Sequence, residues 1–222
     1  MNFKILNLLI VAENALFSEA LTAQLQQGEG FDVKSLGIND LPMTGAELFQ
    51  GLDLVILCGA HPADAETLLR SKSYHGPILH LASPQDSDAH QDVMHLPVRV
   101  PALLQKVRSL AQSFWFRDDL TIALGALSLR PAFKELCRQG EQPVALTDKE
   151  VEILIYLFRA GGKIISRDVL LAEVWGYNAD VSTHTLETHI YRLRQKIETE
   201  PEGNGLLMTE PGGYRLNLTG GE

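Results

Sequence analysis

The segment 183–198 carries the side chains whose types and spacing are most informative about chemistry. At a helical spacing of about 100° per residue, one side is apolar and is formed by Leu186, Ile190, Leu193 and Ile197. The opposite side carries His184, Thr188, Tyr191, Arg192 and Gln195, with Glu187 and Arg194 on one flank and His189 and Lys196 on the other. An arginine has the donor geometry to pair with guanine, and a threonine offers a methyl group to thymine. Considered alone, an ordinary amphipathic surface helix explains this pattern equally well.

The net charge of the chain, −9, does not by itself indicate a partner with a phosphate backbone. Residues 1–120 contain 8 Lys and Arg against 14 Asp and Glu, and the remaining residues contain 11 against 14. Phosphate contact depends on where positive charge lies, and Arg192, Arg194 and Lys196 form a local basic cluster. We therefore expect weak non-specific affinity for phosphate, carried by this cluster.

The length of 222 residues suits one large domain or two small ones. Cys58 and Cys137 lie far apart, so they indicate a reducing compartment and offer no metal-ligand spacing. The apolar run near the N-terminus is too short for a membrane span and is followed by an acidic residue where a cleavage site should be. We expect a cytoplasmic protein that does not interact with a membrane.

Apolar runs alternate with amphipathic segments in the first half of the chain. They predict strands at 6–11, 31–36, 53–57, 78–81 and 93–95, of which 6–11 and 53–57 are expected to be buried. Helices are predicted at 15–26, 45–50, 63–70 and 101–116. The first helix is expected to bury Leu16, Ala20, Leu21 and Leu25. This alternation predicts an α/β doubly wound sheet.

The second half begins with short antiparallel strands, expected at 120–124, 126–129, 133–138 and 144–146. Thr147 and Glu150 form a capping box that begins a helix running to 159, and Ser166 caps a second helix over 167–175. The third helix is 183–198, followed by strands at 206–209 and 214–218 that form a hairpin. This order is the winged helix-turn-helix plan, and we place the domain boundary between 1–117 and 118–222.

The first half resembles the flavodoxin-like receiver domain of two-component response regulators. The resemblance lies in LLIVAEN, DLVILCGAHPA, PILHLAS and HLPV followed by a long helix. In that family two acidic residues hold magnesium, an Asp is phosphorylated, and a Thr or Ser and a Lys complete the pocket. In this chain the corresponding positions hold Ala12, Glu13, Cys58, Ala82 and Leu96, with Ser83 one position late.

Of those five positions, Glu13 alone matches the family. Phosphoryl transfer to a carboxylate requires the carboxylate, a divalent cation and a cationic group. We therefore expect a degenerate pocket without phosphorylation, metal or cofactor. Cys58 is expected to be a small buried hydrophobe, with a redox sensor as the alternative. The polar segment 83–92 lacks an apolar helical face, so the receiver's fourth helix and its usual dimer face are expected to be reduced.

A further hypothesis is that the histidines of the first half form a metal site or a pH sensor. These are His61, His75, His80, His90 and His95. No pair of them has helical ligand spacing with a carboxylate on the same face, which disfavours a metal site.

Residues 144–216 resemble the effector domain of the OmpR/PhoB class. The resemblance lies in VALTDKEVEILIYLF, GGKIISRDVLLAEVWGY, THTLETHIYRLRQKIE and LLMTEPGGYRL, preceded by a four-stranded platform. It implies sequence-specific binding to double-stranded DNA, with the third helix in the major groove and the hairpin near the minor groove. In relatives the loop corresponding to 177–181 contacts RNA polymerase, which makes the polymerase a candidate partner.

The resemblance and the helical geometry together suggest residue roles. Base readout is expected from Glu187, Thr188 and Arg192. Phosphate or sugar contacts are expected from His184, His189, Tyr191, Arg194 and Lys196, although an intraprotein hydrogen bond is an equal alternative for His189. Hairpin contacts are expected from Thr209, Tyr214 and Arg215. Trp175 is expected in the core, and the hairpin is one residue shorter than the family's and lacks its frequent Arg.

These features predict a transcriptional regulator that binds DNA as a homodimer and does not depend on phosphorylation. Two alternatives stay open. One is a conventional phospho-switch with a non-standard receiver site, and the other is a protein–protein adaptor with a vestigial DNA-binding domain. An enzyme is not expected, because the chain has no nucleophile–base set or phosphate-binding loop.

Overall fold

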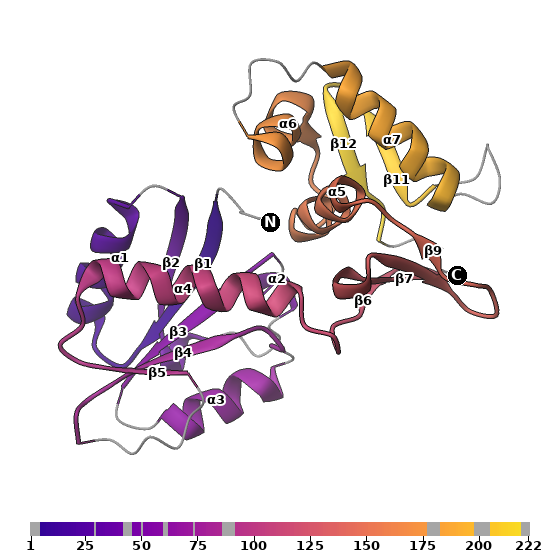
Figure 1. Ribbon diagram of the computed structural model, residues 1–222. Helices are drawn as coiled ribbons and strands as arrows, with labels where there is room; N and C mark the ends of the chain where they lie inside the picture. Colours follow the sequence, from indigo (N-terminus) through magenta and orange to yellow (C-terminus); the bar gives the residue numbers. More distant parts are fainter. Residues whose placement is uncertain are drawn as a thin grey trace. The chain divides into compact units, whose positions relative to one another are not determined.

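The computed structural model describes residues 5–28, 30–41, 46–49, 51–59, 62–72, 74–85, 92–176, 183–197 and 205–218. The chain divides into two compact units, Asn2–Phe114 and Trp115–Glu222. Each unit is described by itself (Figure 1). Within the described ranges, no helix has the length and apolar character needed to cross a membrane.

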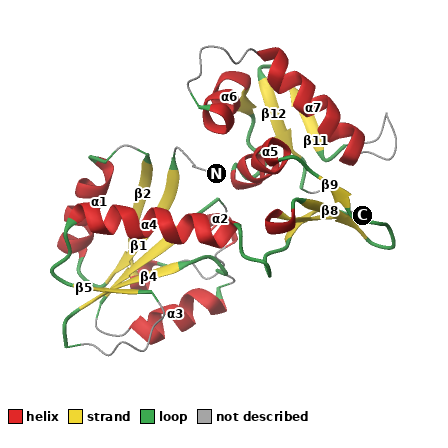
Figure 2. Cartoon of the chain, viewed as in Figure 1, coloured by secondary structure: helices red, strands yellow, loops and turns green. Residues whose placement is uncertain are grey.

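The first unit is a five-stranded parallel sheet in the order β2-β1-β3-β4-β5. Its strands are β1 (Leu6–Ala12), β2 (Phe31–Gly37), β3 (Leu54–Cys58), β4 (Ile78–Ala82) and β5 (Val93–His95). Its helices are α1 (Ala15–Gln26), α2 (Ala46–Phe49), α3 (Pro62–Ser71) and α4 (Val100–Trp115), with a 3-10 turn η1 at Ile38–Asp40. Figure 2 shows the helices surrounding the strands. The predicted doubly wound sheet is confirmed.

Strand side chains alternate between two hydrophobic cores, as the period of two requires. Leu8 and Ile10 of β1 face the core that contains Leu25 of α1 and Val107 of α4. The intervening Leu9 faces the core that contains Leu69 of α3. Helices α1 and α4 therefore cover one face of the sheet, and α2 and α3 cover the other.

The expected buried face of α1 is partly wrong. Leu16 is 77% exposed and Ala20 is exposed, whereas Leu25 is fully buried. Leu21 packs against the core as predicted, and Phe17, which was not predicted, packs there as well. Asn14 caps the helix by accepting from the Phe17 amide at 3.1 Å, and the helix is rotated so that the larger Phe17 is the residue that packs on the sheet. The prediction for the receiver's fourth helix lies largely outside the described residues.

The second unit begins with a four-stranded antiparallel sheet in the order β6-β7-β8-β9. These strands are β6 (Ile122–Leu124), β7 (Leu127–Arg130), β8 (Glu135–Arg138) and β9 (Val144–Ala145), with a 3-10 turn η2 at Pro131–Phe133. The helices α5 (Asp148–Arg159), α6 (Arg167–Trp175) and α7 (Thr183–Ile197) follow. The hairpin strands are β11 (Leu207–Glu210) and β12 (Gly213–Leu216). The predicted winged-helix plan is confirmed.

A third strand, which was not predicted from the sequence, lies beside this hairpin. Strand β10 (Ile165–Ser166) pairs antiparallel with Tyr214 and Gly213 of β12. A Cβ at Gly213 would lie 2.0 Å from the Ile165 carbonyl oxygen, so this close pairing requires glycine. The extra strand joins the start of α6 to the hairpin.

The capping box at the start of α5 is confirmed. The Thr147 hydroxyl accepts from the Glu150 amide at 3.3 Å, and the Thr147 amide donates to Glu150 Oε2 at 2.7 Å. Ser166 caps α6 by accepting from the Val169 amide at 3.2 Å. Both caps satisfy amides that lack partners in the first turn of a helix.

Candidate nucleic-acid interface

Helix α7 has the two faces that its sequence predicts. Leu186 and Leu193 are fully buried, and Ile190 and Ile197 are nearly so. The opposite face is exposed and consists of His184, Glu187, Thr188, Tyr191, Arg192 and Gln195. The buried stripe packs α7 into the unit, so this polar front is presented to solvent by a rigid element.

Local hydrogen bonds order part of the exposed front. The Thr188 hydroxyl donates to the His184 carbonyl at 2.8 Å, so its methyl is the group left for an apolar contact. Gln195 donates to the Tyr191 hydroxyl at 2.8 Å. Arg192 is exposed and forms no hydrogen bond or ion pair with any residue that the structure describes. Its guanidinium therefore remains available for a bidentate contact.

The basic cluster predicted from the sequence is only partly available to a ligand. Arg194 donates through Nε and Nη2 to the Leu207 carbonyl at 3.3 and 3.0 Å. Its Nη2 also donates to the Thr209 hydroxyl at 2.6 Å. Arg194 thus ties α7 to β11, a role that the spacing within the helix did not reveal.

Lys196 also points toward protein partners. Its Nζ donates to Glu150 Oε2 at 2.7 Å and to the Ala145 carbonyl at 2.9 Å. Burial alone would raise the pKa of Glu150, but Lys196 and the Thr147 amide outweigh it and hold that pKa below its usual value. Two of the three N–H donors of Lys196 are thus used by partners on α5 and β9, which leaves one for the predicted phosphate contact.

His189 is half-buried beside Trp175, with the two ring centroids 5.2 Å apart. Burial is the largest cause and lowers the pKa of His189; Glu150 opposes this shift, and Arg192 and Lys149 add to it. Burial therefore favours the neutral form of the His189 ring. Trp175 is only partly buried, and Lys149 lies over its ring at 5.5 Å while donating to the Val174 carbonyl at 2.5 Å.

The hairpin contributes fewer contact groups than expected. Tyr214 is 4% exposed, with the Arg167 guanidinium 5.1 Å from its ring centroid, so little of its surface is left for the predicted DNA contact. Burial against β10 and α6 is the reason. Arg215 Nε donates to Glu210 Oε1 at 2.7 Å, which neutralises much of its charge. Thr209 is exposed.

The five positions of the receiver-like pocket meet at the carboxyl edge of the parallel sheet. Ala12 is the register partner of Cys58, the Glu13 amide donates to the Cys58 carbonyl at 3.3 Å, and the Leu96 amide donates to the Ala82 carbonyl at 2.8 Å. Cys58 is 8% exposed, and burial raises the pKa of its thiol to about 12. The Cys58 side chain is therefore a neutral thiol within the core.

A cavity of about 440 Å³ lies beside this edge, over the ends of β1 and β2. Among the residues that the structure describes, its lining includes the carboxylates of Glu13, Glu19 and Asp40 and no Lys, Arg or His. An anionic phosphoryl group in this cavity would meet like charge. The described lining therefore supplies no side-chain cation to neutralise the charge that develops in phosphoryl transfer.

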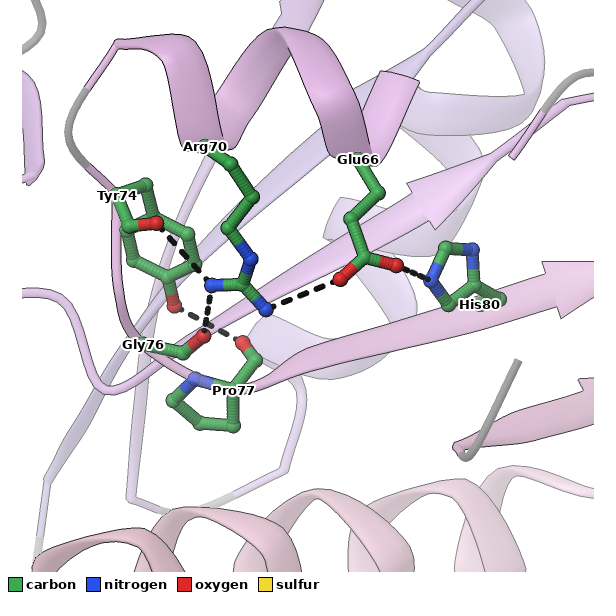
Figure 3. A network of polar contacts seen from close by, with 6 residues as sticks. All are labelled: Glu66, Arg70, Tyr74, Gly76, Pro77 and His80. Carbon is green, nitrogen blue, oxygen red and sulfur yellow. Dashed lines mark hydrogen bonds and ion pairs between the residues drawn. The ribbon is translucent and has the colours of Figure 1, made fainter. Parts of the chain in front are cut away.

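A separate polar network joins α3 to the strand β4 (Figure 3). Glu66 contacts Arg70 at 3.1 Å and the Nε2 of His80 at 3.3 Å, and the His80 side chain is 3% exposed. Arg70 also donates to the carbonyls of Tyr74 and Gly76, at 3.1 and 2.8 Å. The network anchors α3 to the sheet. In the part of the chain that the structure describes, no group of three or more His, Cys, Asp and Glu side chains has the arrangement of a metal site.

Two predicted features fall outside the described residues. These are the loop 177–181 and the histidines at positions 61 and 90. Conversely, the sequence reading missed Arg138, whose Nη2 donates to the Ile197 carbonyl at 2.8 Å across a separation of 59 residues. No local sequence signal could have revealed a contact over that distance.

Both halves of the chain are similar to known proteins. A family model described as "Transcriptional regulatory protein, C terminal" matches residues 141–216. The DNA-binding response regulator MtrA of Mycolicibacterium smegmatis is 30% identical over 220 residues, which cover 94% of this chain and 95% of that protein. The alkaline phosphatase synthesis transcriptional regulatory protein PhoP of Bacillus subtilis is 35% identical over 122 residues, or 53% of this chain and 50% of that protein. The crystal structure of the Thermotoga maritima OmpR/PhoB homologue DrrB is 22% identical, with 96% of this chain and 99% of that chain covered and a TM-score of 0.42.

Proposed function

The chain belongs to the OmpR/PhoB type of DNA-binding response regulators, and on that premise we propose how it reads DNA and how it is controlled. Helix α7 enters the major groove of a promoter site. Thr188, Arg192 and Glu187 read base edges there, while His184, His189 and Tyr191 contact the sugar–phosphate backbone. The observation that carries this proposal is the exposed front of α7, on which Arg192 projects a guanidinium with no partner among the described residues.

The hairpin makes a minor contribution in this proposal. Thr209 and Arg215 lie on β11 and β12, but Arg215 is paired with Glu210. The region over 118–222 acts as the DNA-binding domain and 1–117 as the receiver-like domain. A single α7 buries too little surface for high specificity, so two copies bind two half-sites as a homodimer. RNA polymerase is a further proposed partner, on the basis of the resemblance in the loop 177–181.

Control by aspartyl phosphorylation is not part of this proposal. The phosphoacceptor position holds Cys58, a core thiol, and the described lining of the neighbouring cavity has carboxylates but no Lys, Arg or His side chain. Neither feature supports phosphoryl transfer to a carboxylate. In this proposal the receiver-like domain serves assembly of the homodimer or responds to a signal other than phosphorylation.

Selection from a library of duplexes with the purified full chain tests DNA reading. We expect an enriched motif with two half-sites, and binding that weakens as salt rises because cations on the protein replace counterions on DNA. An Arg192→Ala variant would lose enrichment at one base position of each half-site. If no duplex is preferred even at low ionic strength, the DNA-reading role is wrong and an adaptor role is favoured.

Incubation with acetyl phosphate and magnesium tests the proposal that the chain is not controlled by phosphorylation. We expect the intact mass to stay unchanged, with a conventional response regulator as the positive control. A stable adduct of one phosphoryl group, mapped to any residue of 1–117, would show a phospho-switch with a non-standard site. Sedimentation with and without a two-site duplex measures the expected dimer.

A further inference from the structure

Besides the bonds of Arg194 to β11, three polar contacts join the C-terminal end of α7 to earlier parts of its unit, and they are named here the α7 clamp. Lys196 Nζ donates to Glu150 Oε2 at 2.7 Å and to the Ala145 carbonyl at 2.9 Å. Arg138 Nη2 donates to the Ile197 carbonyl at 2.8 Å. The clamp therefore joins α7 to α5, β8 and β9, which lie 46 to 59 residues earlier in the chain.

Glu150 is the centre of the α7 clamp and cannot easily lose its cation. It is 1% exposed, and the same Oε2 atom that accepts from Lys196 also accepts from the Thr147 amide at 2.7 Å. Removing one partner of a buried ion pair leaves an uncompensated charge in a poorly solvated place. A contact between Lys196 and a DNA phosphate would require that cost, so the structure favours an internal role for Lys196.

Arg138 supplies the second half of the α7 clamp. The last carbonyls of a helix lack intrahelical partners and carry partial negative charge, which a cation near the C-terminus offsets. Ile197 is the last residue of α7, and its carbonyl accepts from Arg138. Arg138 is also held by Glu141, with Nη1 3.2 Å from Oε2. The guanidinium is thus fixed between β8 and the end of α7.

We propose that Lys196 and Arg138 are positioning residues, which set the depth and angle of α7 in the major groove without contacting the phosphate backbone. This inference rests on the proposed function, because it assumes that α7 reads a duplex. A small displacement of α7 misaligns the base-reading side chains, whereas non-specific attraction to phosphate tolerates such a displacement. Loss of the α7 clamp therefore lowers affinity for the preferred duplex far more than affinity for unrelated duplexes.

The test measures binding of the full chain to its selected duplex and to an unrelated duplex across a salt series. The variants are Lys196→Gln, Arg138→Gln and the neutral pair Glu150→Gln with Lys196→Gln. We expect each to lose about tenfold in affinity for the preferred duplex and less than about twofold for the unrelated one. The slope of log affinity against log salt should stay that of the wild type. Lys34→Gln, an exposed cation in the other compact unit, serves as the charge-loss control.

Two results would overturn the proposal. If Lys196 contacts phosphate, Lys196→Gln reduces the salt slope by about 0.9 and weakens both duplexes alike. Unchanged affinity for the preferred duplex would also overturn the proposal. Lys196→Arg, which keeps a cation beside Glu150, should recover most of the specific affinity if the role is positioning.

Folding is monitored so that misfolding is not mistaken for loss of positioning. Lys196→Gln alone leaves the buried Glu150 carboxylate without its cation and could unfold the unit. The double variant Glu150→Gln with Lys196→Gln is therefore the decisive one. A Gln at position 150 still accepts from the Thr147 amide and preserves the capping box. The thermal midpoint should fall less in the neutral pair than in Lys196→Gln alone; equal midpoints would contradict the ion pair. This thermal comparison needs no DNA, so it stands even if the wild type shows no duplex preference and the proposed function fails.

Discussion

Arg194 of α7 and Thr209 of β11 are joined by a hydrogen bond of 2.6 Å from Nη2 to the threonine hydroxyl. The same guanidinium donates to the Leu207 carbonyl, so one arginine holds the helix and the hairpin together. The sequence predicts that Arg194 contacts DNA phosphate, but in the structure its guanidinium donates hydrogen bonds to other residues of the chain. Arg194 thus adds a polar link between α7 and the hairpin, which β10 also pairs with.

We expect Arg194→Ala to destabilise the second unit by about 2–3 kcal/mol, because charge-assisted bonds to β11 are lost. Thr209→Val should cost about 1 kcal/mol or less, since the Leu207 carbonyl keeps its donor. Denaturant unfolding of the full chain measures both, with the exposed Thr121→Val as control. Equal costs for Arg194→Ala and Thr121→Val would contradict the role of Arg194.

Arg192→Ala should cost about 1–3 kcal/mol in binding to the preferred duplex and relax preference at one base position. The reason is that the exposed Arg192 guanidinium is the group best suited to bidentate pairing with guanine. Competition binding with single-base variants of the site gives the measurement. A uniform loss on all duplexes would instead assign Arg192 to the phosphate backbone.

Acidification should destabilise the second unit through His189. The pKa of His189 is lowered in the folded chain, mainly by burial, so the unfolded chain binds its proton first. This group costs no stability above the unfolded pKa of about 6.5, and the penalty grows as pH falls from there through the folded pKa. His189→Gln should flatten the dependence of the thermal midpoint on pH between about 7 and 5.

A direct titration checks the same prediction. The imidazole resonance of His189, followed by NMR, should shift at a lower pH in the folded chain than in the chain unfolded by denaturant. A midpoint for His189 in the folded chain above that in the unfolded chain would contradict the effect of burial.

Cys58 should resist alkylation in the folded chain. Burial raises the pKa of its thiol to about 12, so almost no reactive thiolate forms near pH 8. Iodoacetamide followed by peptide mass spectrometry should label the half-buried Cys137 first and reach Cys58 after unfolding. Rapid labelling of Cys58 in the native chain would reopen the redox-sensor alternative.

Much of the fold follows from local pattern. The apolar runs at β1, β3 and β4 are fully buried strands or nearly so, α1 spans its predicted range, and α6 begins after its predicted cap, Ser166. The buried stripe of α7 is also as expected, because its period is set by helix geometry alone. The error at Leu16 arose because two neighbouring stripes of α1 are both apolar, and only packing on the sheet selects between them.

The sequence by itself determined the fold class, the family and the exposed front of α7, since periodicity, capping and motif order are local properties of the chain. Only the tertiary structure decided which cations of α7 remain available to a ligand. Arg194 and Lys196 lie on the same helix as Arg192, yet their partners Leu207, Ala145 and Glu150 belong to other elements. Spacing along one helix cannot reveal such partners, because they are brought into hydrogen-bonding distance by the packing of distant segments.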